Sequence, residues 1–245
     1  MSIKHSDGII SFSIFDKFPE LICFFSTRKL GNLNVGKLPL SNAKKMLNFF
    51  NIDLIDFAAM NQIHGNIISQ VDKSNKGKLF LKTDGLITQD KNLFLGVKTA
   101  DCVPLFFYDS KQKIVGIVHA GWKGTLINIV QKMIENFVKN GSDVKNIFVV
   151  IGPHIGSCCY DISKERADKF TDKFQFPKSI KERKGKYYLD LGYVNLQILL
   201  NAGVNPEHIE LSYECTSCKN DIYFSYRKDT VETYGEMMGI IGIRN

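Results

Sequence analysis

The stretch VGIVHAGWKGTL, Val115 to Leu126, joins two different patterns. It begins as an apolar, β-branched run that predicts a strand, and it then passes through two glycines around the only tryptophan of the chain. Apolar residues follow at intervals of three and four as far as Val138, and Gly141 ends the helix that they predict. His119 stands at the end of the predicted strand, where an apolar residue would suit a core better. We therefore expect a strand, a tight turn and a helix here, with a working group at the turn.

Further runs rich in β-branched and aromatic residues predict strands along most of the chain. The predicted strands are GIISFSIF (8–15), LICFFST (21–27), GNIISQV (65–71), GLIT (85–88), LFLGV (93–97), VPLFFYD (103–109), KIVGIVHA (113–120), IFVVIGP (147–153), YYLDL (187–191), IELSY (209–213) and IYFSYR (222–227). Weaker helical spacing predicts helices at Ser41–Phe50, Ser163–Phe174 and Gly192–Leu200. Many strands and few helices, without strict alternation, predict an α+β fold with a large mixed sheet or two. Because no linker divides the chain, we expect a single domain over residues 1–245.

The composition is that of an ordinary globular protein, with 245 residues, 44% of them hydrophobic and 23% charged. A formal net charge of +7 favours anionic partners such as phosphates. The lysines are spread along the chain, however, and the densest cluster, KERKGK at Lys181–Lys186, is typical of a solvated loop, so we do not expect a nucleic-acid partner. No run approaches the roughly 20 apolar residues that a membrane span needs, and no signal peptide is recognisable. We expect a cytoplasmic protein, no membrane partner, and six cysteines that stay reduced.

Three of the five histidines share one kind of position. His64, His119 and His154 are each followed, directly or one residue later, by glycine, at or near the end of an apolar run. His5 and His208 lie in polar surroundings that are typical of a surface. One such histidine would ordinarily be a core residue bonded to a backbone carbonyl. Three of them favour a shared site, because strand ends that run into tight glycine turns often carry functional groups.

Cys102 fits the same pattern in TADCVPLF, where it directly follows Asp101 at the start of an apolar strand. Asp101 would be costly to bury without a partner. A cysteine in this position is more often a ligand or a nucleophile than a simple core residue. His64, Cys102 and His119 could together hold a metal ion, with a fourth position left to water or substrate, as in catalytic zinc sites.

Two other cysteine features compete with this interpretation. CTSC, Cys215 to Cys218, has the C-x-x-C form, and Cys158 and Cys159 are adjacent. A structural zinc site from these four is the less favoured interpretation, because such sites normally use two C-x-x-C pairs and a vicinal pair is a poor substitute. A thioredoxin-like motif is not expected, because CTSC does not lie between a strand and a helix of a βαβ unit.

Basic residues next to these motifs suggest an anion site. Gly121, Lys123 and Gly124 precede the predicted helix, whose N-terminal amides carry partial positive charge. Arg28 and Arg227 each follow an aromatic-rich run with a Phe-Ser pair, and an arginine there can bind phosphate with two hydrogen bonds. The stretch is neither a P-loop nor a G-x-G-x-x-G fingerprint, which argues against nucleoside triphosphates and dinucleotides.

The combined motifs resemble the YfiH family, the laccase-domain proteins also known as multicopper-oxidase-like purine nucleoside phosphorylases. The matching stretches, in order, are NQIHG (61–65), TDGLIT (83–88), TADCVPLFFYD (99–109), VGIVHAGWKGT (115–125), IGPHIGSCCYDI (151–162) and FSYRKD (224–229). The resemblance extends from Ser26 to Asp229, nearly the whole chain. It implies an α+β fold of layered mixed β-sheets flanked by helices, distantly related to a cytotoxic necrotizing factor catalytic domain.

The resemblance also implies a chemistry. The histidine of NQIHG, the cysteine of ADC and the histidine of HAGW hold zinc, or copper, and these match His64, Cys102 and His119, which are therefore both the metal ligands and the catalytic candidates. The implied activity is metal-dependent phosphorolysis of adenosine, inosine, guanosine and 5′-methylthioadenosine, with adenosine deamination alongside. The implied partners are purine nucleosides and phosphate, and the protein is expected to be a monomer or a homodimer.

Five residues are the substrate-binding candidates. Arg28 matches the F-S-T-R motif and Arg227 the F-S-x-R motif of the family, and Gln62, Asp101 and Lys123 lie in the matched motifs beside the three ligands. The chain departs from the family in RKLGNLNVG after Arg28, which is shorter and lacks paired glycines, so the preferred nucleoside stays open. The C-terminal TYGEMMGIIGI also lacks the usual arginine-rich helix.

Other functions remain as alternatives. A copper-dependent polyphenol oxidase of the laccase type would need more histidines, because a blue-copper centre already takes two of them and a cysteine. A cysteine hydrolase of small cell-wall-related substrates would use Cys102 as nucleophile and a histidine such as His119 as base. A zinc-stabilised interaction module would unfold when its metal is removed. The H-x-E…P-C-x-x-C signature of zinc nucleobase deaminases is absent, so any deamination would use a different arrangement.

Overall fold

The computed structural model describes residues 3–33 and 41–245. Most strands belong to two large sheets. The first sheet has the order β1 (Ile3–Ser6), β2 (Ile9–Phe12), β3 (Leu21–Ser26), β16 (Met237–Ile243), β8 (Phe94–Thr99), β4 (Phe57–Asn61) and β6 (Leu79–Leu81). The second has the order β15 (Ile209–Leu211), β11 (Ile147–Ile151), β9 (Val103–Asp109), β10 (Ile114–Ala120), β7 (Gly85–Thr88) and β5 (Ile68–Gln70). A small antiparallel sheet holds β12 (Asp161–Ile162), β14 (Lys186–Leu189) and β13 (Ile180–Arg183).

Both large sheets are mixed. β4 runs parallel to β6 and β8 in the first sheet, and β15 and β5 run parallel to their neighbours in the second, whereas the remaining pairs are antiparallel. The helices are α1 (Ser41–Phe49), α2 (Trp122–Leu126), α3 (Ile129–Lys139), α4 (Lys164–Phe174) and α5 (Leu191–Asn201). None of the described helices is long and apolar enough to cross a membrane. The predicted α+β architecture with mixed sheets is confirmed.

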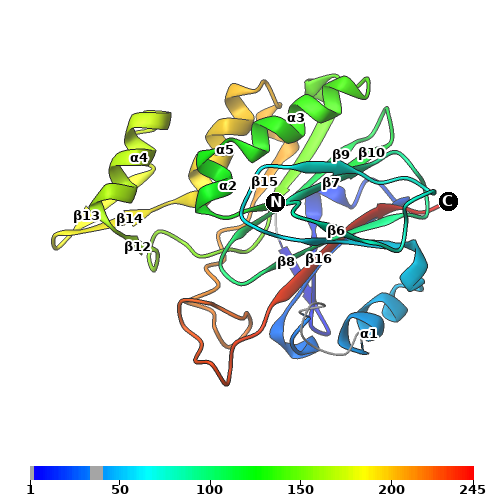
Figure 1. Ribbon diagram of the computed structural model, residues 1–245, viewed down its shortest axis with the longest axis horizontal. Helices are drawn as coiled ribbons and strands as arrows, with labels where there is room; N and C mark the ends of the chain where they lie inside the picture. Colours follow the sequence, from blue (N-terminus) through cyan, green and yellow to red (C-terminus); the bar gives the residue numbers. More distant parts are fainter. Residues whose placement is uncertain (1–2, 34–40) are drawn as a thin grey trace.

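The elements form layers (Figure 1). The two large sheets pack face to face, with α2, α3 and α5 on the outer side of the six-stranded sheet and α1 on the outer side of the seven-stranded sheet. The small sheet and α4 extend to one side of these layers (Figure 1). Strand β9 is buried on both faces, since Leu105 and Phe107 pack toward the helices while Phe106 and Tyr108 pack between the two sheets. This double burial explains why its sequence is continuously apolar instead of alternating.

The single helix predicted after the stretch Val115–Leu126 consists of two helices. Its pattern predicts one continuous helix from Leu126, but α2 ends at Leu126 and α3 begins at Ile129, because Asn128 between them adopts a left-handed conformation with φ of 60°. Asparagine tolerates that conformation better than most residues. The three weaker helices are confirmed as α1, α4 and α5. Ser163 caps α4 and Asp190 caps α5 with side-chain hydrogen bonds.

The strand predicted at residues 222–227 is wrong. This stretch forms turns, because its backbone N–H groups bind carboxylates: Ser225 N donates to Asp229 and Arg227 N donates to Asp101. GIISFSIF is also only partly a strand, since β2 ends at Phe12 and a 3-10 turn follows. The loop after Arg28, from residue 34 to residue 40, lies outside the described residues.

The C-terminal segment forms β16, a strand that we did not predict. It pairs with β3 on one side and β8 on the other, so it lies inside the seven-stranded sheet. Its glycines make room for aromatic rings: a Cβ on Gly239 would lie 2.5 Å from Phe106 of the other sheet, and one on Gly242 would lie 2.3 Å from Phe94. Glycine weakens β-strand patterns in a sequence, which explains why this strand was missed.

We predict that Gly239→Ala destabilises the protein. The added methyl group meets the ring of Phe106 in the core between the sheets. Overpacking of this kind typically costs about 1–3 kcal/mol of unfolding free energy. Urea unfolding measures the loss. In a Phe106→Leu background the ring is gone, so the same alanine should cost much less, and an equal cost in both backgrounds would contradict the proposed close packing.

Candidate metal centre and substrate cleft

The structure brings the three predicted ligands together. His64 lies in the loop after β4, Cys102 in the connection between β8 and β9, and His119 near the end of β10. Their ligand atoms all lie within 4.8 Å of one another, and His64 Nε2 is 3.9 Å from Cys102 Sγ. β4 and β8 belong to one large sheet and β10 to the other. The cluster therefore forms where loops from the two sheets meet.

Asp84 organises both histidines, and sequence reasoning missed it. Its carboxylate accepts the backbone N–H groups of Ile63, His64 and Gly65 at 2.7–3.1 Å. These three hydrogen bonds stabilise the left-handed conformation of His64, whose φ is 60°. The same carboxylate lies 2.8 Å from Nδ1 of His119. The sequence pattern that could have identified Asp84 is TDGLIT, in which an acidic residue precedes a glycine and an apolar strand.

The arrangement fits a metal ion. Because Nδ1 of His119 donates to Asp84, its Nε2 is left for a metal, as in carboxylate–histidine–metal arrangements. Gly121 keeps the space open, since a Cβ there would lie 2.8 Å from the His64 ring and 3.0 Å from Cys102 Sγ. Two imidazoles and a thiolate with room for a further ligand are a donor set that zinc and copper both accept. His64, Cys102 and His119 could therefore hold one metal ion.

The electrostatics of the group favour the thiolate form of Cys102, but they keep His119 protonated near neutral pH, so a metal ion would have to displace a proton from His119 Nε2. Burial raises the pKa of the Cys102 thiol, but the charge and hydrogen bond of His119, with a smaller effect of His64, outweigh burial and lower the pKa to about 7. Burial lowers the pKa of His119, but Cys102 and Asp84 together raise it to about 9. Burial likewise raises the pKa of Asp84, while His119 and backbone N–H groups lower it below its ordinary value. A thiolate at Cys102 is thus accessible near neutral pH, as metal binding needs.

The three residues open into a cleft of about 550 Å³. This volume is in the range of small-molecule sites. Aromatic side chains contribute much of its wall, and the cleft carries basic side chains as well. The lining includes Trp122, Tyr160, Tyr226 and Tyr234, together with Arg166 and Arg227.

The substrate-binding candidates Gln62 and Asp101 line the cleft but also have structural bonds. The Gln62 amide donates to Lys98 O at 2.7 Å and accepts from Lys98 N at 2.9 Å, so it joins the loop after β4 to β8. Asp101 is buried and accepts hydrogen bonds from Thr216 Oγ1 and Ser225 Oγ at 2.6 and 3.0 Å. Burial raises the pKa of Asp101, and these hydrogen bonds oppose the rise. Asp101 thereby has the partners that its burial requires.

The three basic candidates occupy different positions. Arg227 lines the cleft, where its guanidinium pairs with Asp161. Arg28 is not among the lining residues: it donates to Asp229 at 2.6 Å and its guanidinium lies 4.6 Å from the centre of the Phe224 ring. Lys123 is exposed and is not among the lining residues, and it lies within α2, which begins at Trp122, and not before the helix as predicted. A substrate role for Arg28 and Lys123 stays a prediction.

His154 is not part of the group, so the expectation of three histidines in one site is wrong. It is buried, and its Nδ1 donates to the backbone oxygen of Gly152 at 2.7 Å. Gly192 packs so closely that a Cβ there would lie 2.3 Å from His154 Nε2. Arg166, which lies 4.1 Å above the Trp122 ring in the cleft, was missed because it stands in an ordinary polar helix pattern.

The comparisons with known proteins agree with this architecture. Residues 39–244 match the model of a family described as multi-copper polyphenol oxidoreductase laccase. Purine nucleoside phosphorylase YlmD of Bacillus subtilis (strain 168) is 36% identical over 219 residues, which cover 84% of this chain and 77% of that protein. Adenosine deaminase RL5, from an unknown prokaryotic organism, is 29% identical over 199 residues, covering 77% of this chain and 76% of that protein.

A solved structure supports the same relationship over the full length. The crystal structure of the hypothetical protein YfiH of Bacillus licheniformis has a TM-score of 0.90 to this chain at 31% identity and covers 99% of each chain. The chain belongs to the laccase-domain family, also known from YfiH and YlmD.

We predict that Asp84→Asn weakens metal binding about 10- to 100-fold, the usual effect of losing a carboxylate behind a ligating histidine. The amide nitrogen cannot accept hydrogen bonds from the loop of His64 or from His119. Competition with a chelator of known zinc affinity measures the change. Asp109→Asn is the matched control, because Asp109 is equally buried and accepts backbone N–H groups from Lys111 and Gln112 at the far end of β9. Unchanged zinc retention in Asp84→Asn would contradict the assigned role.

Proposed function

We propose that the protein is a purine nucleoside phosphorylase whose metal ion is zinc, held by His64, Cys102 and His119, with adenosine deamination as an accompanying activity. One observation carries the proposal: the metal-ligand group opens into a cleft that has both aromatic walls and arginines. Relatives named purine nucleoside phosphorylase and adenosine deaminase support it. The proposed substrates are adenosine, inosine, guanosine and 5′-methylthioadenosine.

The aromatic wall suits a purine base. Trp122 and Tyr160 line the cleft, and Tyr226 and Tyr234 line it with rings that meet edge to face, their centres 5.9 Å apart. Flat aromatic faces stack on bases with little regard to the base's identity. Ile155 adds apolar surface that suits the methylthio group of 5′-methylthioadenosine. The aromatic wall therefore favours an enzyme that accepts several purine nucleosides over one that is specific for a single nucleoside.

The arginines suit phosphate. Arg227 and Arg166 both line the cleft, and their planar guanidinium groups can donate two hydrogen bonds each to phosphate oxygens. Arg227 is held by the turn whose backbone binds Asp101, the neighbour of the ligand Cys102. This link fixes the phosphate side of the cleft relative to the metal ligands.

The reaction requires that a phosphate oxygen bonds to C1′ of the ribose while the bond from C1′ to the purine nitrogen breaks and its electron pair leaves with the base. The products are ribose 1-phosphate and the free purine after it takes up a proton. The arginines orient and partly neutralise the phosphate, and the aromatic wall holds the purine in place. Zinc, when bound, acts as a Lewis acid toward a substrate oxygen or water. Asp84 fixes the orientation of His64 and His119 throughout.

The alternatives differ in what they need from the same residues. A laccase would need further histidine-rich copper sites, and the other candidate metal group among the described residues consists of four cysteines. A cysteine hydrolase needs Cys102 free of metal, because a ligated thiolate cannot attack. An interaction module predicts that the chain unfolds without metal, whereas the proposed enzyme predicts a folded but inactive apoprotein.

We predict that the purified, zinc-loaded protein converts adenosine to adenine and ribose 1-phosphate only when phosphate is present. Chromatography of the products with and without phosphate tests this. Inosine formed at the same rate in both reactions, with no free adenine, would contradict the phosphorylase proposal. Cys102→Ala should lose the phosphate-dependent activity and keep the circular dichroism of the wild type. Cys23→Ala, a change in β3 away from the cleft, is the control and should keep it.

We predict that Arg227→Gln raises the KM for phosphate about tenfold, since one lost charge-assisted hydrogen bond is worth roughly 1.5–3 kcal/mol. The KM for the nucleoside should change far less. Arg183→Gln is the matched control, because Arg183 also lies over an aromatic ring, that of Tyr188, outside the cleft. Arg28→Gln in the same assay tests the other candidate. If Arg227→Gln leaves the phosphate KM unchanged, Arg227 does not bind phosphate.

A further inference from the structure

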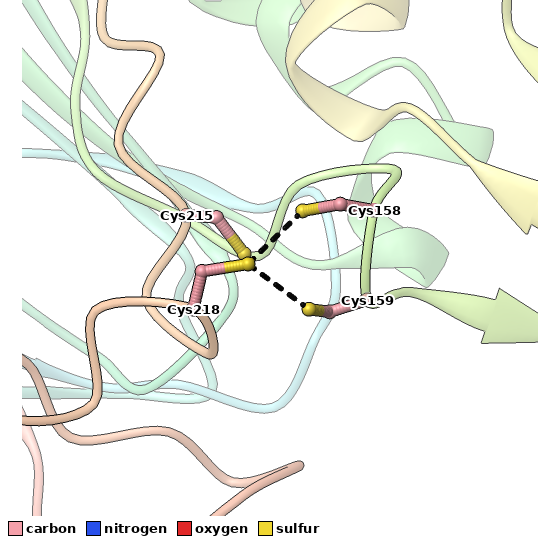
Figure 2. A group of neighbouring side chains, drawn as sticks. All are labelled: Cys158, Cys159, Cys215 and Cys218. Carbon is pink, nitrogen blue, oxygen red and sulfur yellow. Dashed lines mark hydrogen bonds between the residues drawn. The ribbon is translucent and has the colours of Figure 1, made fainter.

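Four cysteines gather at a second place in the molecule (Figure 2). Cys158 and Cys159 lie on one turn, and Cys215 and Cys218 lie on another, with all four sulfur atoms within 4.8 Å of one another. Cys218 Sγ is 3.4 Å from Cys158 Sγ and 3.3 Å from Cys159 Sγ. All four thiols are free. We expected a vicinal pair to be a poor substitute for a second C-x-x-C pair, but here the sulfurs of Cys158 and Cys159 both lie next to Cys218 Sγ.

The backbone, not the sulfurs, brings the two turns together. His154 forms an isolated parallel bridge with Cys215, and Thr216 N donates to His154 O at 3.0 Å. Each turn is closed by its own hydrogen bond, from Cys159 N to Gly156 O and from Lys219 N to Cys215 O. The backbone hydrogen bonds thus position the four thiols close together without help from the sulfur atoms, as a preorganised metal site requires.

We propose that Cys158, Cys159, Cys215 and Cys218 bind a second zinc ion, as a tetrathiolate site separate from His64, Cys102 and His119. Tetrahedral zinc with Zn–S bonds of about 2.3 Å separates its sulfurs by about 3.8 Å. The measured contacts of 3.3 and 3.4 Å and the outer limit of 4.8 Å bracket that value. Thiolate ligands are soft and select zinc over magnesium or calcium.

The surroundings of the sulfurs support ligation. Gly156 N donates to Cys215 Sγ at 3.2 Å, the kind of backbone contact that stabilises a ligating thiolate. Gly156 is also needed for close approach, because a Cβ there would lie 3.2 Å from Cys158 Sγ. A disulfide accounts for the group less well, since Cys218 contacts two thiols equally and could bond only one of them.

The site is structural, because four protein ligands leave no position for a substrate. Thr216, inside the CTSC turn, donates to Asp101 Oδ1 at 2.6 Å, next to Cys102. Ser157, beside Cys158, donates at 3.1 Å to Asp190, the residue that caps α5. Zinc at the four cysteines would therefore hold the Cys215–Cys218 turn against the loop that carries Cys102 and the Cys158–Cys159 turn against the start of α5. This role does not depend on which reaction the cleft performs.

Metal analysis of purified variants tests the proposal. The wild type is expected to bind zinc at both sites, Cys218→Ser only at the histidine-containing site, and Cys102→Ala only at the four cysteines, so each variant should hold half of the wild-type zinc. Cys23→Ser is the matched control and should keep the full content. Folded Cys102→Ala protein without zinc, or with iron in its place, would overturn the proposal.

A second measurement covers the case in which Cys218→Ser does not fold. The Cys102→Ala protein, loaded with Co²⁺ in place of zinc, should show the strong thiolate-to-metal absorption and the visible bands of a tetrahedral sulfur site. Thiol titration of the denatured, chelator-treated protein should find all four cysteines reduced. An internal disulfide among them, or Co²⁺ spectra without thiolate absorption, would overturn the proposal.

Discussion

The candidate site depends on one buried carboxylate. Asp84 directly precedes β7 of the six-stranded sheet, and it holds the loop of His64, which extends from the seven-stranded sheet. It also pairs with His119 on β10. Burying a carboxylate is costly unless each oxygen is satisfied, and here each oxygen accepts two hydrogen bonds. The same contacts that satisfy the charge also bring His64 and His119, from two different sheets, to one point.

Asp101 has a similar role on the other side of Cys102. It receives hydrogen bonds from Thr216, Ser225 and the backbone of Arg227, all more than a hundred residues further along the chain. The C-terminal turns are thereby fixed to the loop that carries Cys102, and β16 returns the chain to the seven-stranded sheet. Two neighbouring residues thus have different tasks: Cys102 faces the histidines, and Asp101 holds the turn that carries Arg227.

Sequence reasoning selected the three residues that the fold brings together, because the two histidines stand near glycines at the ends of apolar runs and Cys102 follows an acidic residue at the start of one. It also found β9 and β10, whose double burial leaves a continuous apolar signal. It failed where distant partners decide the local structure. The run at residues 222–227 has a strand-like pattern, but the distant carboxylate of Asp101 accepts the N–H of Arg227 and the nearby carboxylate of Asp229 accepts that of Ser225. The convergence of Cys158 and Cys159 on Cys218 is likewise set by a backbone bridge that no spacing rule encodes.

Anomalous X-ray scattering from crystals of the purified protein at the zinc absorption edge tests the central claim most directly. The account predicts a peak within bonding distance of His64 Nε2, Cys102 Sγ and His119 Nε2, at the end of the cleft, with Asp84 still bonded to His119 Nδ1. An anomalous peak at that position that is lost below the zinc edge would identify the element. Zinc-saturated crystals with no anomalous peak among these three residues would contradict the account, whatever is found at the four cysteines.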